Sequence, residues 1–261
     1  MKKLILLLCI FLFNACEEFW EVLDYDFTNI SKFTVQVGEH QYKVETPEGY
    51  KIPFSVQSSS KWKYCALIDK NHQYEKQVIG CDGDWNKLGG LTTEVLGEHK
   101  QNSGMWAFKY YDSILYVSPY THDGNIVHKQ NEINYGEYIT SEGETIIANE
   151  FGIKIEFEKA YNLEIIDSSS FFIYKFENQT IAIHTHSISG EDYYRIILPW
   201  FGGDCPFEGI LENGTIVSEA SIYLGKTNKT TKQKLEEACE LTKFNEIQFK
   251  QYMEYLENNN Y

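Results

Sequence analysis

Basic residues are scarce in this chain, and arginine is almost absent. Arg195 is the only arginine among 261 residues, and Lys and Arg together number 23 against 38 Asp and Glu, which gives a formal charge of −15. Because binding to a phosphate backbone needs a basic surface, this composition argues against nucleic acid as a partner. An acidic charge of this size favours solubility, and it also attracts basic partners or cations.

Recognisable catalytic motifs are missing as well. The sequence has no Gly-x-Ser-x-Gly elbow, no His-Glu-x-x-His, no phosphate-binding glycine loop and no Ser-x-x-Lys with its partner motifs. Carboxylates are too numerous to single out a glycosidase pair. We therefore expect a binding protein without catalytic activity that recognises a protein or a glycan, for instance an immunity-type protein. The alternative is an exported hydrolase that uses carboxylates or a metal held by His184 and His186.

The N-terminus carries an export pattern. Lys2 and Lys3 precede an apolar run over residues 4–13, which is too short to span a bilayer, and Asn14-Ala15-Cys16 follows. This segment resembles the signal peptide and lipobox of bacterial lipoproteins, except that Phe13 stands where leucine is usual. The resemblance implies that residues 1–15 are removed and that the Cys16 thiol is lipidated. It also implies a tether over residues 16–30 and a position at the outer membrane of the cell envelope.

The side of the membrane stays open. Glu17 and Glu18 follow the lipobox cysteine and are similar to the surface-export signals of lipoproteins from the Bacteroides group. A periplasmic position is the alternative. Without the two lysines of the signal, the formal charge of the mature chain becomes −17.

Four cysteines remain once Cys9 leaves with the signal and Cys16 takes lipid. An even number in an exported chain indicates disulfides, and pairing of near neighbours predicts Cys65–Cys81 and Cys205–Cys239. Cys239 also fits the apolar stripe of a helix, where it would be buried. No CxxC occurs, so the spacing excludes a zinc knuckle.

Two groups have the residue types of metal ligands. Asp82, Asp84 and Asn86 alternate as oxygen ligands do in calcium loops, but Lys87 stands at the sixth position, where such loops have glycine. His184 and His186 lie two residues apart on a strand, a spacing at which both side chains reach one Zn²⁺. We expect no cofactor, with Ca²⁺ or Zn²⁺ at these positions as the alternatives.

The single arginine is the candidate ligand-binding residue. A guanidinium grips a carboxylate or phosphate with two parallel hydrogen bonds, and Arg195 is flanked by Tyr193, Tyr194 and Trp200. Further aromatic residues exceed what a modest core needs and are of the type that stacks on sugars or anchors protein interfaces; they are Trp62, Trp85, Trp106, Tyr110, Tyr111, Tyr116 and Tyr120. We expect most of them to fill a core.

The body of the chain is predicted to be mainly β, an antiparallel sandwich or barrel. Aromatic residues make up 15% of the chain, and short alternating runs follow one another with turn signals between them. The β body is expected over residues 31–225, as one large domain or as two small ones with a boundary near 120–130. Residues 226–261 are expected to form a helical hairpin, with one helix beginning at Thr230-Thr231 and a second after Asn245.

One predicted hairpin has a clear pattern of faces. With Asn178-Gln179 as its turn, the alternation places one set of side chains in the core, namely Phe172, Tyr174, Phe176, Ile181, Ile183 and Thr185. The opposite, half-exposed face then carries Phe171, Ile173, Lys175, Ala182, His184 and His186.

Overall fold

The computed structural model describes much of the chain between residues 31 and 240. The described residues are 31–46, 49–51, 56–57, 60–74, 85–92, 102–123, 127–130, 133–140, 142–168, 170–186, 194–202, 206–227 and 231–240. Within this part, no helix is long and apolar enough to cross a membrane. The predicted signal and tether lie outside it.

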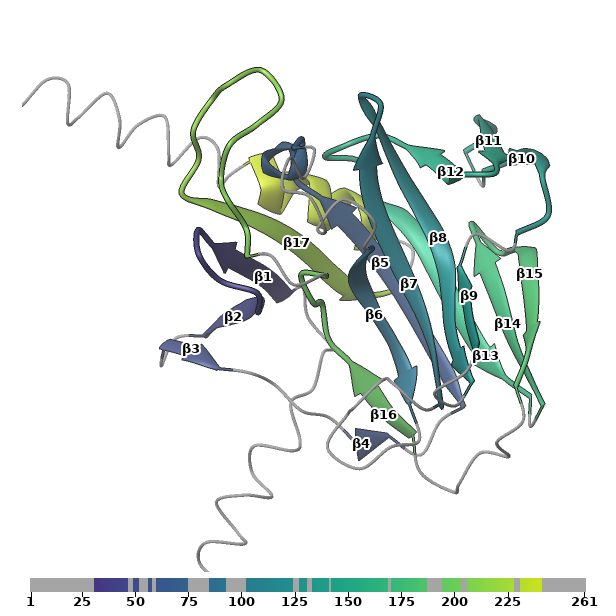
Figure 1. Ribbon diagram of the computed structural model, residues 1–261. Coiled ribbons are helices and arrows are strands. Elements are labelled where there is room, and N and C mark those ends of the chain that lie inside the picture. Colours follow the sequence, from purple (N-terminus) through teal and green to yellow (C-terminus); the bar gives the residue numbers. More distant parts are fainter. Residues whose placement is uncertain are drawn as a thin grey trace, which may run out of the picture.

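Two antiparallel sheets make up most of the described residues (Figure 1). The eight-stranded sheet has, in spatial order, β15 (Gln179–Thr185), β14 (Phe171–Phe176), β13 (Tyr161–Asp167), β5 (Lys61–Ile68), β17 (Glu219–Lys226), β1 (Ser31–Gln36), β2 (Lys43–Thr46) and β3 (Gly49–Lys51). The nine-stranded sheet has β10 (Gly136–Ile139), β11 (Thr145–Asn149), β12 (Gly152–Ile155), β8 (Ile114–Asp123), β7 (Asn102–Tyr111), β6 (Asn86–Thr92), β16 (Tyr194–Ile197) and β4 (Val56–Gln57), while β9 (Val127–Gln130) pairs with β8. A short 3₁₀-helix spans Lys70–His72.

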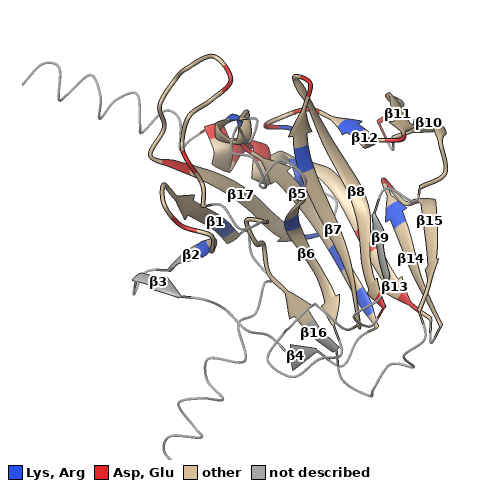
Figure 2. Ribbon diagram, in the orientation of Figure 1, with Lys and Arg blue, Asp and Glu red and all other residues tan. Residues whose placement is uncertain are grey.

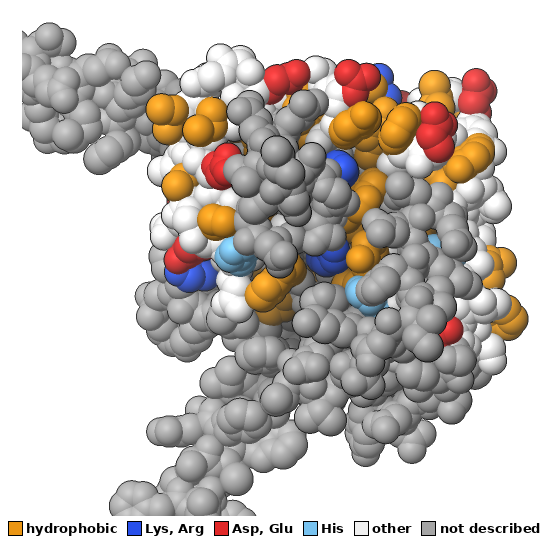
Figure 3. Space-filling model, in the orientation of Figure 1, with side chains coloured by type: hydrophobic (Ala, Val, Ile, Leu, Met, Phe, Trp, Pro, Cys, Tyr) orange, Lys and Arg blue, Asp and Glu red, His pale blue; other side chains and the backbone are white. Residues whose placement is uncertain are grey.

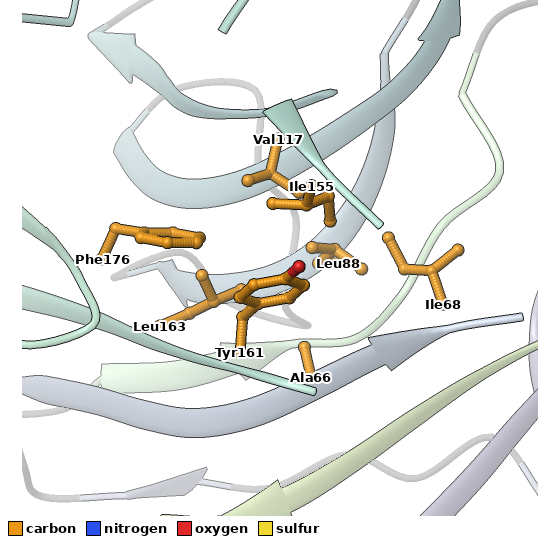
Figure 4. A pocket seen from close by; sticks show the side chains of 8 residues that line it. All are labelled: Ala66, Ile68, Leu88, Val117, Ile155, Tyr161, Leu163 and Phe176. Carbon is orange, nitrogen blue, oxygen red and sulfur yellow. The ribbon is translucent and has the colours of Figure 1, made fainter. Parts of the chain in front are cut away.

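The main hydrophobic core lies between the sheets. Both inner faces contribute fully buried aromatic side chains, among them Phe33, Trp62, Trp106, Phe172 and Tyr174. A cavity of about 10 Å³ within this core is lined only by Ala66, Ile68, Leu88, Val117, Ile155, Tyr161, Leu163 and Phe176 (Figure 4). This volume is at the lower limit for one water molecule, so the cavity is a packing void and not a ligand site. The prediction of a mainly β, antiparallel sandwich is confirmed.

Strands from both halves of the sequence contribute to each sheet. β5 pairs with β13 and β17, and β8 pairs with β7 and β12. The sequence analysis allowed for a boundary between two smaller domains near residues 120–130. Strands on either side of that position pack around the same core.

The β14–β15 hairpin differs from its predicted register. Its turn is Glu177-Asn178, with φ of 48° and 66°, and a β-bulge lies between Tyr174 and Lys175. Because a bulge adds one residue to one strand only, it exchanges the two faces beyond it. His184 is therefore buried and Ile183 is 59% exposed, the reverse of the prediction for β15.

One α-helix, residues 231–240, covers the outer face of the eight-stranded sheet. Leu235 and Cys239 of the helix pack against Cys65 and Tyr223 of the strands. Lys232 of the helix donates to Glu142 at 2.9 Å and lies 3.0 Å from the buried carboxylate of Glu177 (helix in yellow in Figure 1). The predicted second helix lies outside the described residues, so the described part contains one helix and not a pair.

Cys65 and Cys239 are buried thiols that form no disulfide, in contrast to the predicted pairing. Both are buried in the cluster between helix 231–240 and the sheet, as the apolar stripe of the helix indicated for Cys239. Burial raises the pKa of the Cys65 thiol to about 12. Their predicted partners, Cys81 and Cys205, lie outside the described residues.

Candidate functional site

The outer face of the nine-stranded sheet holds the candidate site. Successive side chains of a strand alternate between faces, and the pairing of β6, β7, β8 and β12 fixes which ones point away from the core. The outward side chains are Lys87, Thr92, Ser103, Met105, Ala107, Lys109, Tyr111, Ile114, Tyr116, Ser118, Tyr120, His122 and Lys154. Part of this set forms a hydrophobic cluster of its own with Trp85 and Ile197.

The charge of this face is opposite to that of the chain. Among the outward positions of these four described strands, three carry lysine, one carries histidine and none carries Asp or Glu. Figure 2 shows lysine on β6, β7 and β12, with acidic residues on the surrounding loops and on the helix. In Figure 3, lysine and histidine side chains lie among hydrophobic ones on the same side of the molecule. We call this surface the cationic face.

Lys87 belongs to the cationic face because β6 is irregular. The pairing of β6 with β7 shifts between Lys87 and Gly89, so that Leu88 enters the core while Lys87 lies opposite the outward Ala107. The Lys87 ammonium lies 4.1 Å from the centre of the Tyr120 ring and donates to the Trp85 carbonyl at 2.5 Å. Backbone hydrogen bonds of 2.7 and 2.9 Å to Trp200 hold the strand at this residue.

Tyr120 and His122 lie on β8, and Tyr120 is next to Lys87 of β6. Their ring centres are 5.1 Å apart, as expected for alternate residues on one face of a strand. Lys87, Tyr120 and His122 are all 5% exposed or less. The Lys87 charge therefore lies away from bulk water, where it acts on a bound anion more strongly than it would in water. A phenol and an imidazole are groups that donate and accept protons in catalysis.

A hollow of about 270 Å³ opens at one end of the same face. It is lined by Trp85, Lys109, Tyr111, Tyr116 and Phe151. The Phe151 ring lies 5.4 Å from that of Tyr111 and 5.9 Å from that of Tyr116. The Lys109 ammonium lies 5.4 Å from the Tyr111 ring. The lining thus combines aromatic surfaces with one positive charge.

The two histidines given as the alternative Zn²⁺ site face the core. His184 Nδ1 lies 2.8 Å from the Thr121 hydroxyl, which is 2.6 Å from the Tyr174 hydroxyl. His186 Nε2 lies 3.1 Å from the buried Asp167 carboxylate. The half-exposed position predicted for the pair is wrong, because the bulge in β14–β15 reverses the faces. The described residues contain no group of three or more His, Cys, Asp or Glu side chains placed to hold a metal.

The structure describes only some of the residues predicted for the calcium site and for ligand binding around Arg195. Asn86 is buried, accepts from the Gly202 amide at 2.9 Å and donates to the Tyr74 hydroxyl at 3.3 Å, so it joins β6 to these two residues. Trp200 is 36% exposed next to the cationic face. Three other candidates lie outside the described residues, namely Asp82, Asp84 and Tyr193. The backbone of β16 is described, and Arg195 pairs with Thr92, but the side chains of Tyr194 and Arg195 are not described.

The cationic face was not predicted as a unit, although the sequence contains a signal for it. Residues 102–122 contain a single acidic residue, Asp112, in a chain with 38 of them. Asp112 lies in the β7–β8 turn with a φ of 49°, where it does not project from a strand. A local absence of carboxylates within a strongly acidic chain would have marked this hairpin.

No protein-family model and no curated protein matches the sequence. Among solved structures, the chain is similar to an alginate lyase in complex with an alginate trisaccharide, at 12% identity and a TM-score of 0.45, over 78% of this chain and 90% of that one. A carbohydrate-binding module from Bacillus subtilis matches at 11% identity and a TM-score of 0.36, over 73% and 94%. A family 16 endo-glucanase from Bacteroides ovatus matches at 11% identity and a TM-score of 0.38, over 75% and 77%.

These similarities correct one expectation from the sequence. We predicted a binding protein without catalytic activity, whereas the similar structures include alginate lyases and glucanases, which are enzymes that act on glycans. The missing motifs did not justify that prediction, because they belong to other enzyme classes.

Proposed function

We propose that the protein binds and cleaves an anionic polysaccharide, one that contains uronic acid residues, on the cationic face. The observation that carries the proposal is the charge of this face. Outward positions of β6, β7, β8 and β12 carry lysine, histidine and tyrosine without a carboxylate, in a chain of formal charge −15. A positive surface framed by negative ones directs an anionic ligand to one place.

The polymer is proposed to be a glycan because of the aromatic side chains on the same face. Tyr111 and Phe151 are half-exposed and present flat apolar surfaces that sugar rings stack on, while the lysines pair with carboxylates. The nucleic acids are excluded as the anion by the overall charge, since they need many basic contacts and release of counterions.

The reaction that these groups support is elimination. A base takes the proton from the carbon next to the uronate carboxylate, a C=C bond forms, and the C–O bond to the neighbouring sugar breaks as its oxygen takes up a proton. Tyr120 and His122 are the groups placed to exchange protons with the substrate, and the Lys87 charge stabilises the carboxylate as electrons move onto it.

The residues of this face support hydrolysis of a neutral glucan less well than elimination. Glycosidases place two carboxyl groups about 5–5.5 or 6.5–9.5 Å apart across the scissile bond. The outward positions of the four described strands supply none. Carboxylates there would also oppose the charge of a uronate polymer.

The test compares purified protein on polyuronates and on neutral β-glucans. Elimination leaves an unsaturated sugar that absorbs ultraviolet light, together with one new reducing end for each cleavage. We expect both signals in equal amounts from a polyuronate, their loss in His122→Gln and Tyr120→Phe, and normal activity in the Phe171→Ala control on β14. Reducing ends without ultraviolet absorbance, or cleavage of the neutral glucan alone, would refute the proposal.

We also propose that the protein is anchored by lipid at Cys16 to the outer membrane, on its periplasmic or its outer side. The support is the sequence of residues 1–18, in which a basic start and an apolar run precede Ala15-Cys16. Several acyl chains are needed for a stable anchor. Cys16→Ser is expected to release the protein from sedimented membranes, and a variant that still sediments fully would contradict the anchor.

A further inference from the structure

The hollow at the end of the cationic face has no role in the elimination step itself. We infer that it is a distal subsite that holds one uronate residue of the polysaccharide, stacked between aromatic side chains and paired with Lys109. This inference rests on the proposed function. It adds a second place at which the polysaccharide is bound, and it explains which length of polysaccharide the protein prefers.

The fold brings Phe151 to the hollow by a close backbone approach. Residues 150 and 151 form the turn between β11 and β12, and the Asn149 side chain accepts from the Phe151 amide at 2.9 Å. Gly152 follows with a φ of 124°, and a Cβ there would lie 2.7 Å from the Val117 carbonyl oxygen and 3.4 Å from Cβ of Tyr116. Only glycine lets the turn lie this close to β8, so Phe151 stands next to the Tyr116 ring.

The exposure of the lining indicates a ligand and not only packing. Phe151 is 41% and Tyr111 is 46% exposed, although their rings lie within 5.4 Å of each other. Trp85 and Tyr116 are 5% exposed and form the floor. Two half-exposed rings above a buried aromatic floor leave apolar surface in water, which a stacked sugar ring would cover.

Charge and continuity identify the occupant. Lys109 lines the hollow beside the Tyr111 ring, so an anionic sugar fits better than a neutral one. Tyr116 of the hollow and Tyr120 of the proposed reaction centre lie four residues apart on the same face of β8, which is about 13 Å along the strand. A ligand must therefore contain several sugars to occupy both places at once.

The experiment measures the affinity of purified protein for a ladder of uronate oligosaccharides by calorimetry, with His122→Gln as background to prevent cleavage. Affinity is expected to rise with length until the oligosaccharide reaches the hollow, and then to level off. Phe151→Ala and Lys109→Gln should each weaken binding of the long oligosaccharides about tenfold and leave that of the short ones unchanged.

Matched controls lie on the other sheet. Phe171 of β14 is also 41% exposed, and Lys175 is a half-buried lysine of the same strand, so Phe171→Ala and Lys175→Gln test the loss of an exposed ring or a charge away from the face. Both controls are expected to bind every oligosaccharide as the His122→Gln background protein does. Circular dichroism checks that all variants keep the fold.

The outcomes separate the subsite from the proposed function. If Phe151→Ala and Lys109→Gln bind long oligosaccharides as tightly as the background protein, or lose affinity equally at every length, the subsite is refuted while glycan binding at the cationic face stands. If the background protein binds no uronate oligosaccharide of any length, the proposed function fails and the subsite fails with it.

Discussion

The close approach of the β11–β12 turn to β8 gives a sharp test of the architecture around the site. Gly152 has a φ of 124°, and a Cβ there would meet the Val117 carbonyl oxygen at 2.7 Å. A non-glycine residue in this backbone region costs about 1–3 kcal/mol, and overpacking against a backbone atom that cannot turn away adds about 1–3 kcal/mol. We expect Gly152→Ala to lower the free energy of unfolding by about 3 kcal/mol or more.

The matched control is Gly143→Ala. Gly143 also has a positive φ, 85°, but nothing lies within 4 Å of a Cβ there, so only the backbone strain of about 1 kcal/mol applies. Urea unfolding measures both variants. In a domain of this size each kcal/mol lowers Tm by about 2–4 °C, so Gly152→Ala should melt about 6–12 °C below the parent protein. Equal effects of the two substitutions would refute the described contact between the turn and β8.

Three further predictions concern the helix, the thiol and the cationic face. Lys232→Met removes the cation beside the buried Glu177 carboxylate and should destabilise the protein by about 1–2 kcal/mol in urea unfolding. The control, Lys234→Met at an exposed position, should leave the free energy of unfolding unchanged. Equal effects of the two substitutions would show that the ion pair is unimportant. The Cys65 pKa of about 12 predicts that its thiol stays protonated from pH 8 to 11 and reacts with thiol reagents only after unfolding. The stability that comes from burying the neutral thiol is fully present below the unfolded pKa of about 8.5 and is lost as pH rises through 12. Fast labelling of the native protein at pH 8 would contradict this prediction. Lys87→Met should weaken polyuronate binding at least tenfold in affinity electrophoresis, and unchanged binding would remove Lys87 from the site.

Much of the fold follows from local patterns in the sequence. In β12, Ile153 and Ile155 are buried while Lys154 is exposed, as their alternation predicts. The hairpin of β1 and β2 forms around Gly38, which has a φ of 84°. Such features depend only on neighbouring residues, so a single sequence is enough to predict them.

The wrong assignment of faces in the β14–β15 hairpin arises where one residue is added to a strand. The bulge after Tyr174 turns His184 and His186 toward the core, and the shift after Lys87 lets Leu88 enter the core. Whether a strand tolerates a bulge depends on the strands packed on both sides of it, which lie far away in the sequence. The candidate site depends on such a shift, because the residues of the cationic face come together only through the pairing of β6, β7, β8 and β12.

The central claim is that carboxylates of a polysaccharide are recognised by the cationic face. The most direct test compares one polyuronate with the same polymer after its carboxylates have been reduced to primary alcohols, which removes the charge and keeps the backbone. We predict that the protein binds the native polymer, with an affinity that falls as salt is added, and binds the reduced polymer at least a hundredfold more weakly. Equal affinity for the two polymers would contradict the claim.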